Sequence, residues 1–257
     1  MKWRDNNLRR RLGREPLAAF WMAMGSTTIV ELAGAAAPDA FIIDMQHGLW
    51  DRATLEAAVG TVPADASVLV RVAENSAVAI GQALDTGAEG VIVPLVESAE
   101  EAAQAVAAAR FPPLGRRSGG GVRPLAAGFM DYCAGADERT VVGVMIETAR
   151  GVDNATAIAG TAGVDFVLIG TGDLTLSLAR DDAHPHRCEE ACRAVREACG
   201  KAGISCAIFT TGAEQAAARA AEGYDMVVPA NDIGVVAQGF AAAMQAFRKE
   251  ASGKNEG

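Results

Sequence analysis

The chain has 257 residues, of which half are hydrophobic and 21% are charged, and its formal net charge is -9. This length suits one α/β barrel, and the composition is that of a globular protein rather than a disordered one. The acidic excess argues against nucleic acid or an anionic membrane as a partner. Five cysteines, an odd number in a long chain, indicate reduced thiols in the cytoplasm rather than a disulfide framework.

The amino-terminal segment has some features of a secretory signal. Arg9–Arg11 precede an apolar stretch at residues 16–24, but Glu15 and Glu31 flank that stretch closely. Secretory signals carry an uninterrupted apolar region of about 7–15 residues, and a membrane span needs roughly 18. We therefore expect the segment to belong to the folded, cytoplasmic chain, with no membrane partner.

Short apolar runs alternate with Ala- and Glu-rich segments along the whole chain. Near-continuous apolar runs are typical of parallel strands buried on both faces. Eight such runs lie at 18–24, 40–44, 67–71, 90–94, 141–147, 165–170, 205–208 and 226–229. Helical patterns lie between them at 52–61, 77–86, 97–110, 154–160, 187–202, 213–222 and 233–249.

Eight strand–helix units in about 250 residues predict a (β/α)8 TIM barrel, with a doubly wound sheet as the alternative. No linker divides the chain, so we expect one domain over residues 1–257, with an extension at 1–15 and a frayed tail at 251–257. The one long insertion, residues 111–140, opens with a Pro- and Gly-rich stretch and is predicted to be a lid or binding loop.

Polar residues collect where the predicted strands end. Asp44 and His47 end or follow the second strand, Arg71 ends the third, Glu147 the fifth, and Asp173 follows the sixth. Chemistry in a barrel sits at the carboxyl ends of the strands, so these side chains are predicted to face one shared mouth. Capping of the following helix is a reasonable alternative for Asp44, but a weak one for Arg71 and Glu147.

Glu147 and Asp173, on consecutive strands, are the best candidate metal pair. Two carboxylates leave most positions of an octahedral ion to water and substrate, which favours Mg²⁺ or Mn²⁺ over a structural zinc. Asp173 also suits the N-cap of a helix at 174–178.

The lysines exclude one mechanism. A Schiff-base aldolase needs a buried amine at a strand end, but the four lysines lie elsewhere, at Lys2, Lys201, Lys249 and Lys254. His47 is the one histidine at a strand end, which makes it the candidate general base, with Asp44 as an orienting carboxylate.

Two weaker patterns remain. Gly170 and Gly172 do not form a dinucleotide fingerprint, so no nucleotide cofactor is predicted; their backbone amides offer a site for a carboxylate instead. The segment from His184 and His186 to Cys188 and Cys192 carries zinc-ligand residue types, but its cysteines lie on one helix face, where a small buried side chain is the more common role.

These ordered residues resemble the HpcH/HpaI family of class II aldolases over about residues 20–247. The resemblance rests on the motifs Phe41–Gly48, Leu69–Val72, Asp85–Pro94, Phe111–Arg117, Met145–Thr148, Gly163–Asp165 and Ile169–Leu174. It implies a metal-dependent, cytoplasmic lyase that forms homo-oligomers. These would be built on dimers that exchange the last helix, Ile233–Lys249, with a hexamer as one candidate assembly. The implied metal is Mg²⁺ or Mn²⁺, with Co²⁺ as a further candidate.

The resemblance also implies residue roles. Glu147 and Asp173 would hold the ion, and the amides of Gly172 and Asp173 would help to hold the substrate carboxylate. Arg71 would neutralise the keto oxygen as it becomes an enolate. His47 would serve proton transfer through water, oriented by Asp44 and by Asp85 of a neighbouring subunit.

The implied reaction cleaves or forms a carbon–carbon bond in a 4-hydroxy-2-oxo acid through pyruvate enolate, giving pyruvate and an aldehyde. Alternatives within the family are a citrate synthase using oxaloacetate and acetyl-CoA in a siderophore pathway, and an oxaloacetate decarboxylase. A barrel that only binds or scaffolds is the alternative outside enzymes. Gln46, Met145 and Ser118 depart from residues common in the family, and Ser118 is a candidate substrate contact, so the substrate stays open.

Overall fold

The computed structural model describes residues 8–179 and 187–253. Eight parallel strands form a closed barrel in sequence order, and β1 pairs with β8 to close it. The predicted TIM barrel is therefore confirmed. The strands are β1 (Leu17–Met22), β2 (Ala40–Asp44), β3 (Ser67–Arg71), β4 (Gly90–Val93), β5 (Val141–Ile146), β6 (Phe166–Ile169), β7 (Ser205–Ile208) and β8 (Met226–Asn231).

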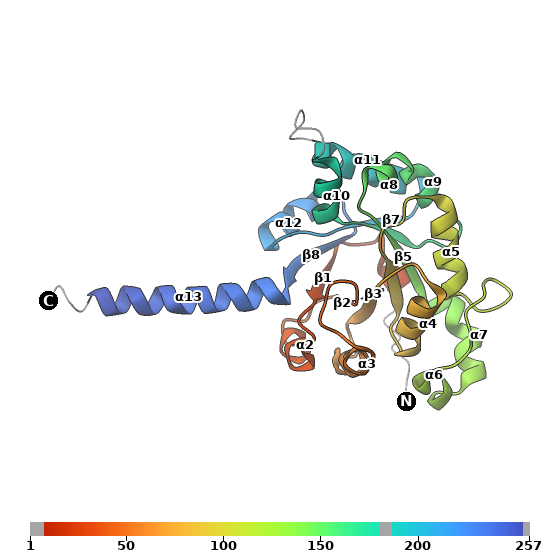
Figure 1. The fold of residues 1–257 in the computed structure, drawn as a ribbon, viewed down its shortest axis with the longest axis horizontal. Helices are drawn as coiled ribbons and strands as arrows, with labels where there is room; N and C mark the ends of the chain where they lie inside the picture. Colours follow the sequence, from red (N-terminus) through yellow and green to blue (C-terminus); the bar gives the residue numbers. More distant parts are fainter. Residues whose placement is uncertain (1–7, 180–186, 254–257) are drawn as a thin grey trace.

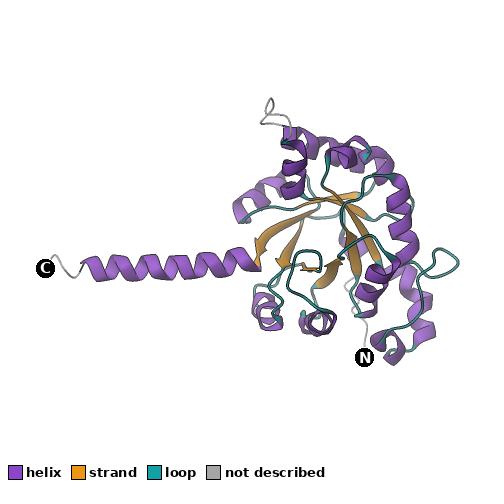
Figure 2. Cartoon of the chain, viewed as in Figure 1, coloured by secondary structure: helices purple, strands orange, loops and turns teal. Residues whose placement is uncertain are grey.

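Helices surround these strands, so that the orange strands lie inside a purple ring in Figure 2. The helices are α1 (Leu8–Arg11), α2 (Thr27–Gly34), α3 (Arg52–Thr61), α4 (Ala77–Asp85), α5 (Ala99–Ala109), α6 (Val122–Ala126), α7 (Phe129–Arg139), α8 (Ala149–Asp153), α9 (Ala155–Ala159), α10 (Thr171–Leu178), α11 (Arg187–Ala202), α12 (Ala213–Ala221) and α13 (Asp232–Gly253).

The strands are buried on both faces, as their apolar runs predict. In β2, Ala40 and Ile42 belong to the cluster inside the barrel, whereas Phe41 and Ile43 belong to the cluster between barrel and helices. Successive side chains of a strand point to opposite faces, so each strand supplies both cores. This is why no strand alternates between apolar and polar residues.

The amino-terminal segment closes the barrel at the amino ends of the strands. Leu8 is fully buried in the interior cluster. Arg9 forms an ion pair of 2.9 Å with Asp165, just before β6, and Arg11 pairs with Asp39, just before β2. The arginine run therefore contributes ion pairs to the fold itself.

The prediction of one long loop at residues 111–140 is wrong. The helices α6 and α7 fill most of it, and Phe111 packs edge-on against Tyr132 with ring centroids 6.0 Å apart. The Gly-rich stretch at 118–121 is typical of a loop, so the sequence did not indicate the two helices that follow it. The segment connects α5 to β5, so it lies at the amino ends of the strands rather than over the mouth.

The last helix, α13, projects away from the barrel (Figure 1). Its large apolar side chains Ile233, Phe240, Met244 and Phe247 are between 48% and 73% exposed. Helical structure continues through residue 253, beyond the start expected for a frayed tail. Among the described residues, no helix is long and apolar enough to cross a membrane.

Candidate functional site

A cavity of about 230 Å³ lies at the carboxyl ends of the strands. Its walls come from β1, β3, β5 and the segments that follow β2, β6 and β7. The lining residues are Trp21, His47, Arg71, Met145, Glu147, Gly170, Thr171, Gly172, Asp173 and Phe209. The candidate residues taken from three separate strand ends and from α10 therefore surround one space.

Asp44 and Arg71 form a buried ion pair on one side of this cavity. Arg71 Nε donates to Asp44 Oδ1 at 2.8 Å, and Arg71 Nη2 donates to Asp44 Oδ2 at 2.6 Å. The two residues are 2% and 7% exposed. Burial by itself raises the pKa of Asp44, but the hydrogen bonds and charge of Arg71 outweigh it and hold the pKa below its usual value. Asp44 therefore fixes the guanidinium as a charged group facing the cavity.

Asp44 orients the backbone after β2 as well. Its Oδ1 accepts the backbone N–H groups of Gln46 and His47 at 3.0 and 3.2 Å. Gly48 is required in this turn, because a Cβ there would lie 2.2 Å from the carbonyl oxygen of Asp44. The carboxylate thus positions the main chain that carries His47, whose exposed side chain lines the cavity.

Two aromatic residues of the site were not predicted. Trp21 and Phe209 pack edge to face, with centroids 5.1 Å apart. The Arg71 guanidinium lies 4.8 Å from the centroid of Trp21, and the indole Nε1 donates to Asp44 Oδ2 at 3.2 Å. Trp21 therefore restrains both members of the ion pair. In the sequence it reads as an ordinary core residue, and only its position near the end of β1 hints at the site.

Glu147 is buried at the cavity that Arg71 also lines, and its carboxyl group contacts another acid. Burial is the main cause that raises its pKa to about 7, and the nearby, hydrogen-bonded carboxyl of Asp173 raises it further. The backbone N–H of Leu95, at 2.8 Å from Oε1, and the charge of Arg71 act in the opposite direction. The two carboxyl groups of the predicted pair therefore lie together at the same rim of the barrel.

The start of α10 adds backbone donors beside these acids. A Cβ on Gly170 would lie 2.6 Å from Glu147 Oε2, so only glycine leaves that carboxylate room. α10 begins at Thr171, and Asp173 lies in its first turn rather than capping a helix at 174–178. The first N–H groups of a helix have no partner within it, so those of Gly172 and Asp173 can bind an anion.

Asp85 and Ser118 lie outside this cavity in their own chain. Asp85 is the last residue of α4, which leads to the amino end of β4, and Ser118 is exposed in the segment that leads to β5. Asp85 pairs instead with the buried Arg117, at 2.9 Å. The structure therefore brings neither residue to His47 within one chain.

The site fits a divalent ion of the Mg²⁺ type. Two carboxyl groups lie in contact, one of them buried beside a glycine whose missing side chain leaves it open. Hard oxygen ligands with free positions for water and substrate are what Mg²⁺ and Mn²⁺ prefer. Over residues 8–179 and 187–253, no group of three or more His, Cys, Asp or Glu side chains is arranged to hold a metal.

The predicted minor role of the cysteine segment agrees with the packing that can be seen. Cys192 is buried in the helix-side core, and burial raises the pKa of its thiol to about 12, helped by Cys188. A zinc ligand must be a thiolate, which this environment disfavours. His184 and His186 lie outside the described residues.

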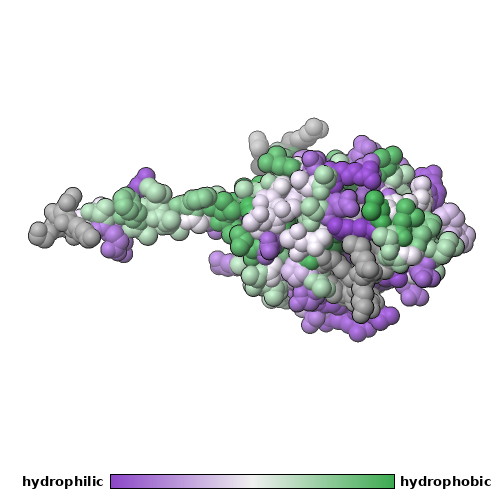
Figure 3. Space-filling view, turned by 90° about the horizontal axis from the view of Figure 1, so that it is seen from below, coloured by the Kyte–Doolittle hydropathy of each residue, from purple (hydrophilic) through white to green (hydrophobic). Residues whose placement is uncertain are grey.

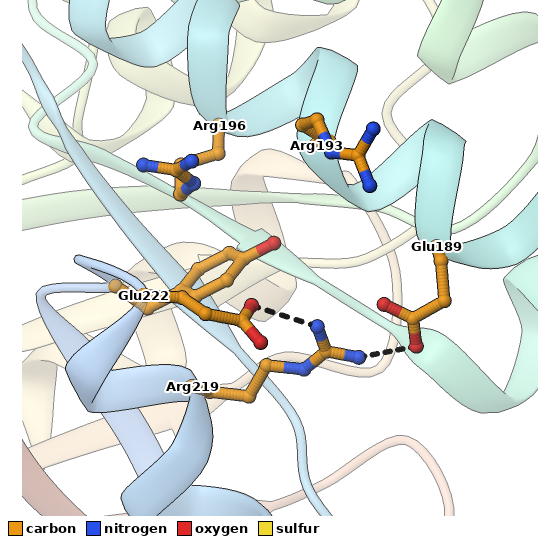
Figure 4. A pocket seen from close by; sticks show the side chains of 6 residues that line it. Glu189, Arg193, Arg196, Arg219 and Glu222 are labelled. Carbon is orange, nitrogen blue, oxygen red and sulfur yellow. Dashed lines mark hydrogen bonds and ion pairs between the residues drawn. The ribbon is translucent and has the colours of Figure 1, made fainter.

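A second pocket, of about 270 Å³, lies on the outer wall between α11 and α12 (Figure 4). Arg219 binds two carboxylates there, those of Glu189 and Glu222. The guanidinium groups of Arg193 and Arg196 point to different sides in Figure 4, so the arginines do not converge on one point. This pocket lacks the paired acids and open backbone donors of the barrel mouth.

Replacing Asp44 by Asn is expected to lower the free energy of unfolding by about 3 kcal/mol at pH 7, because it leaves Arg71 buried without a counter-ion. Urea unfolding measures the loss. Since the pKa of Asp44 is held low, the contribution of Asp44 to the free energy of unfolding is complete at neutral pH. It declines only as the pH falls through the lowered pKa.

The exposed N-cap carboxyl of Asp51, changed to Asn, is the matched control and should have a much smaller effect. Adding Arg71→Met to Asp44→Asn should restore part of the loss, because it removes the orphaned charge. Equal losses of unfolding free energy for Asp44→Asn and Asp51→Asn would contradict this account of the ion pair.

Comparison with known proteins agrees with this geometry. A family model described as HpcH/HpaI aldolase/citrate lyase matches residues 17–238. A hydroxypyruvate/pyruvate aldolase of Paraburkholderia phytofirmans is 31% identical over 95% of this chain and 98% of its own length. A 4-hydroxy-2-oxovalerate aldolase of Rhodococcus jostii is 39% identical, but the match spans 65% of this chain and 66% of that relative.

Solved structures of similar fold point to the same family. A crystal structure of an HpcH/HpaI aldolase/citrate lyase family protein from Burkholderia cenocepacia superimposes with a TM-score of 0.88, at 33% identity over 95% of this chain and 99% of that one. A citrate synthase named SbnG gives a TM-score of 0.84, at 25% identity over 96% of this chain and 100% of that one. The chain belongs to the HpcH/HpaI aldolase/citrate lyase family.

Proposed function

We propose that this protein is a divalent metal-dependent aldolase that cleaves 4-hydroxy-2-oxo acids to pyruvate and an aldehyde. The observation that carries the proposal is the pair of contacting carboxyl groups, Glu147 and Asp173, facing a buried and charged Arg71 across one cavity. A cation held by the acids and a guanidinium on the other side suit an electron-rich oxygen between them. The odd number of cysteines in a long chain supports the proposal that it works in the reducing cytoplasm.

Glu147 and Asp173 would hold Mg²⁺ or Mn²⁺, which supplies Lewis-acid polarisation of the keto group when bound. The free backbone N–H groups of Gly172 and Asp173 bind the substrate carboxylate. Arg71 keeps donors free beyond those that bind Asp44, and these stabilise the oxygen that becomes negative when the C3–C4 bond breaks.

His47, directly or through a water, takes the proton of the 4-hydroxyl group. The C3–C4 bond then breaks, the aldehyde is released from C4, and the electron pair of the bond forms the enolate. Return of the proton to C3 gives pyruvate and regenerates His47. Trp21 and Phe209 line the same cavity and give it an apolar wall.

Glu147→Gln is expected to reduce pyruvate release by about a hundredfold or more, because the substituted site cannot hold the ion that stabilises the enolate charge. The assay couples pyruvate to lactate dehydrogenase over a panel of 4-hydroxy-2-oxo acids. Chelation of wild-type protein should give the same loss. Glu74→Gln, an exposed acid in the loop after β3, is the control and should keep activity. Full activity after chelation would refute the metal-dependent mechanism.

Metal affinity should rise between pH 6 and pH 8. Because the pKa of Glu147 without metal is about 7, its carboxyl is mostly protonated at pH 6, and a proton must leave before an ion binds. Calorimetry with Mn²⁺ should give affinity that is about tenfold weaker at pH 6 than at pH 8. A flat profile for wild-type protein would argue against Glu147 as a ligand.

The citrate synthase reaction is the second candidate. It is favoured by the structural similarity to the citrate synthase named above, and the paired acids and Arg71 would serve an oxaloacetate ligand equally well. Thiol release from acetyl-CoA in the presence of oxaloacetate, measured beside pyruvate release, separates the two reactions.

The assembly we propose is a homo-oligomer built on dimers that exchange α13. The exposed apolar residues Ile233, Phe240, Met244 and Phe247 recur at intervals of seven, four and three, which places them on one helical face. An apolar groove of about 390 Å³ lies at the root of the helix, between β1 and α2. Figure 3 shows apolar atoms along much of the projecting helix. The apolar face of α13 from a second copy of this chain is the occupant that fits this groove.

Phe240→Glu should dissociate the dimer, because it buries an unpaired charge in the proposed contact. Sedimentation at fixed protein concentration measures the mass in solution. Gln245→Glu adds the same charge to the same helix and is the control, which should remain associated. A wild-type protein that is monomeric at micromolar concentration would refute the exchange.

A further inference from the structure

A strained turn follows β4 and touches the paired acids. Leu95 has a φ of +54°, and among the described residues only Leu95 and Ala37 have positive φ without being glycine. Leucine is disfavoured in this left-handed region, since its Cβ crowds the following carbonyl group. Residues held in such conformations are concentrated at functional sites.

The neighbours of Leu95 hold the turn in place. Val96 is 1% exposed, and its N–H donates to the carbonyl oxygen of Met145 at 3.1 Å. The turn is therefore fastened to β5 only two residues before Glu147. The side chain of Leu95 itself is 50% exposed, so burial of that side chain does not explain the strained backbone.

The turn directs the N–H of Leu95 to Glu147. The nitrogen lies 2.8 Å from Oε1, while Oε2 points to the opposite side, close to Gly170. One carboxylate oxygen is thus bound by backbone from β4, and the other faces the start of α10, where Asp173 lies. A carboxylate fixed at one oxygen loses the rotation that would otherwise spread its second oxygen over many positions.

We propose that Leu95 is a positioning residue, whose left-handed backbone presents an N–H group that orients Glu147 toward Asp173 for ion binding. The inference rests on the proposed function, because it concerns the same ion. It assigns the role to the backbone conformation at position 95 and none to the leucine side chain.

Substitutions that change the backbone preference but keep the N–H group test this role. Leu95→Gly and Leu95→Asn tolerate the left-handed region, whereas Leu95→Val, which is β-branched, opposes it. Calorimetry with Mn²⁺ should give affinities within about twofold of wild type for Gly and Asn, and an affinity about tenfold weaker for Val. Leu49→Val, an 80% exposed residue in the loop after β2, is the matched control and should bind as wild type does.

The outcomes distinguish failure of the proposed function from failure of the role assigned to Leu95. Wild-type protein that binds no Mn²⁺ would refute the proposed function. Wild-type and Leu95→Val proteins that bind equally well would overturn the role of the turn alone. Thermal unfolding without metal shows whether Leu95→Val is folded; if it is not, Leu95→Gly still decides, because a marked loss of affinity there would assign the role to the side chain and overturn the inference.

Discussion

A buried acidic side chain in contact with a second, half-buried one is the constraint around which the mouth of this barrel is arranged. Glu147 is 2% exposed, and burial with the nearby Asp173 raises its pKa to about 7. The charge of Arg71 offsets this rise in the pKa of Glu147 only in part, because Asp44 binds the guanidinium group at two positions. A proton on Glu147 or a nearby cation would remove this electrostatic cost, and the metal site proposed above uses the cation.

The surrounding fold makes that cost tolerable. A few backbone features hold the acids in place. Gly170 leaves space for one oxygen of Glu147, and the turn at Leu95 binds the other. On the other side, Trp21 contacts both Asp44 and Arg71, so the cation facing the acids cannot rotate away. Rigid placement of charge in a cavity of low polarity is what makes such groups effective in catalysis.

The sequence predicted a large part of this arrangement for a simple reason. Parallel strands in a closed barrel all end at one rim, so the polar residues at those ends, such as Arg71 and Glu147, had to meet. Trp21 and Phe209 were missed because an aromatic residue at a strand end cannot be told from a core residue by its type. The helices α6 and α7 were missed because they come after a Gly-rich stretch, which is typical of a loop, and α6 is also short.

The sequence by itself determined the strand order, the two buried faces of each strand and the set of groups at the rim, because apolar periodicity and strand ends are local properties. Only the tertiary structure decided that Asp44 binds Arg71 as well as the backbone N–H of His47, and that the N–H of Leu95 binds Glu147. It also decided that Asp85 and Ser118 lie away from the cavity of their own chain. These contacts depend on how neighbouring strands and loops are registered in space, which no local pattern of residues contains.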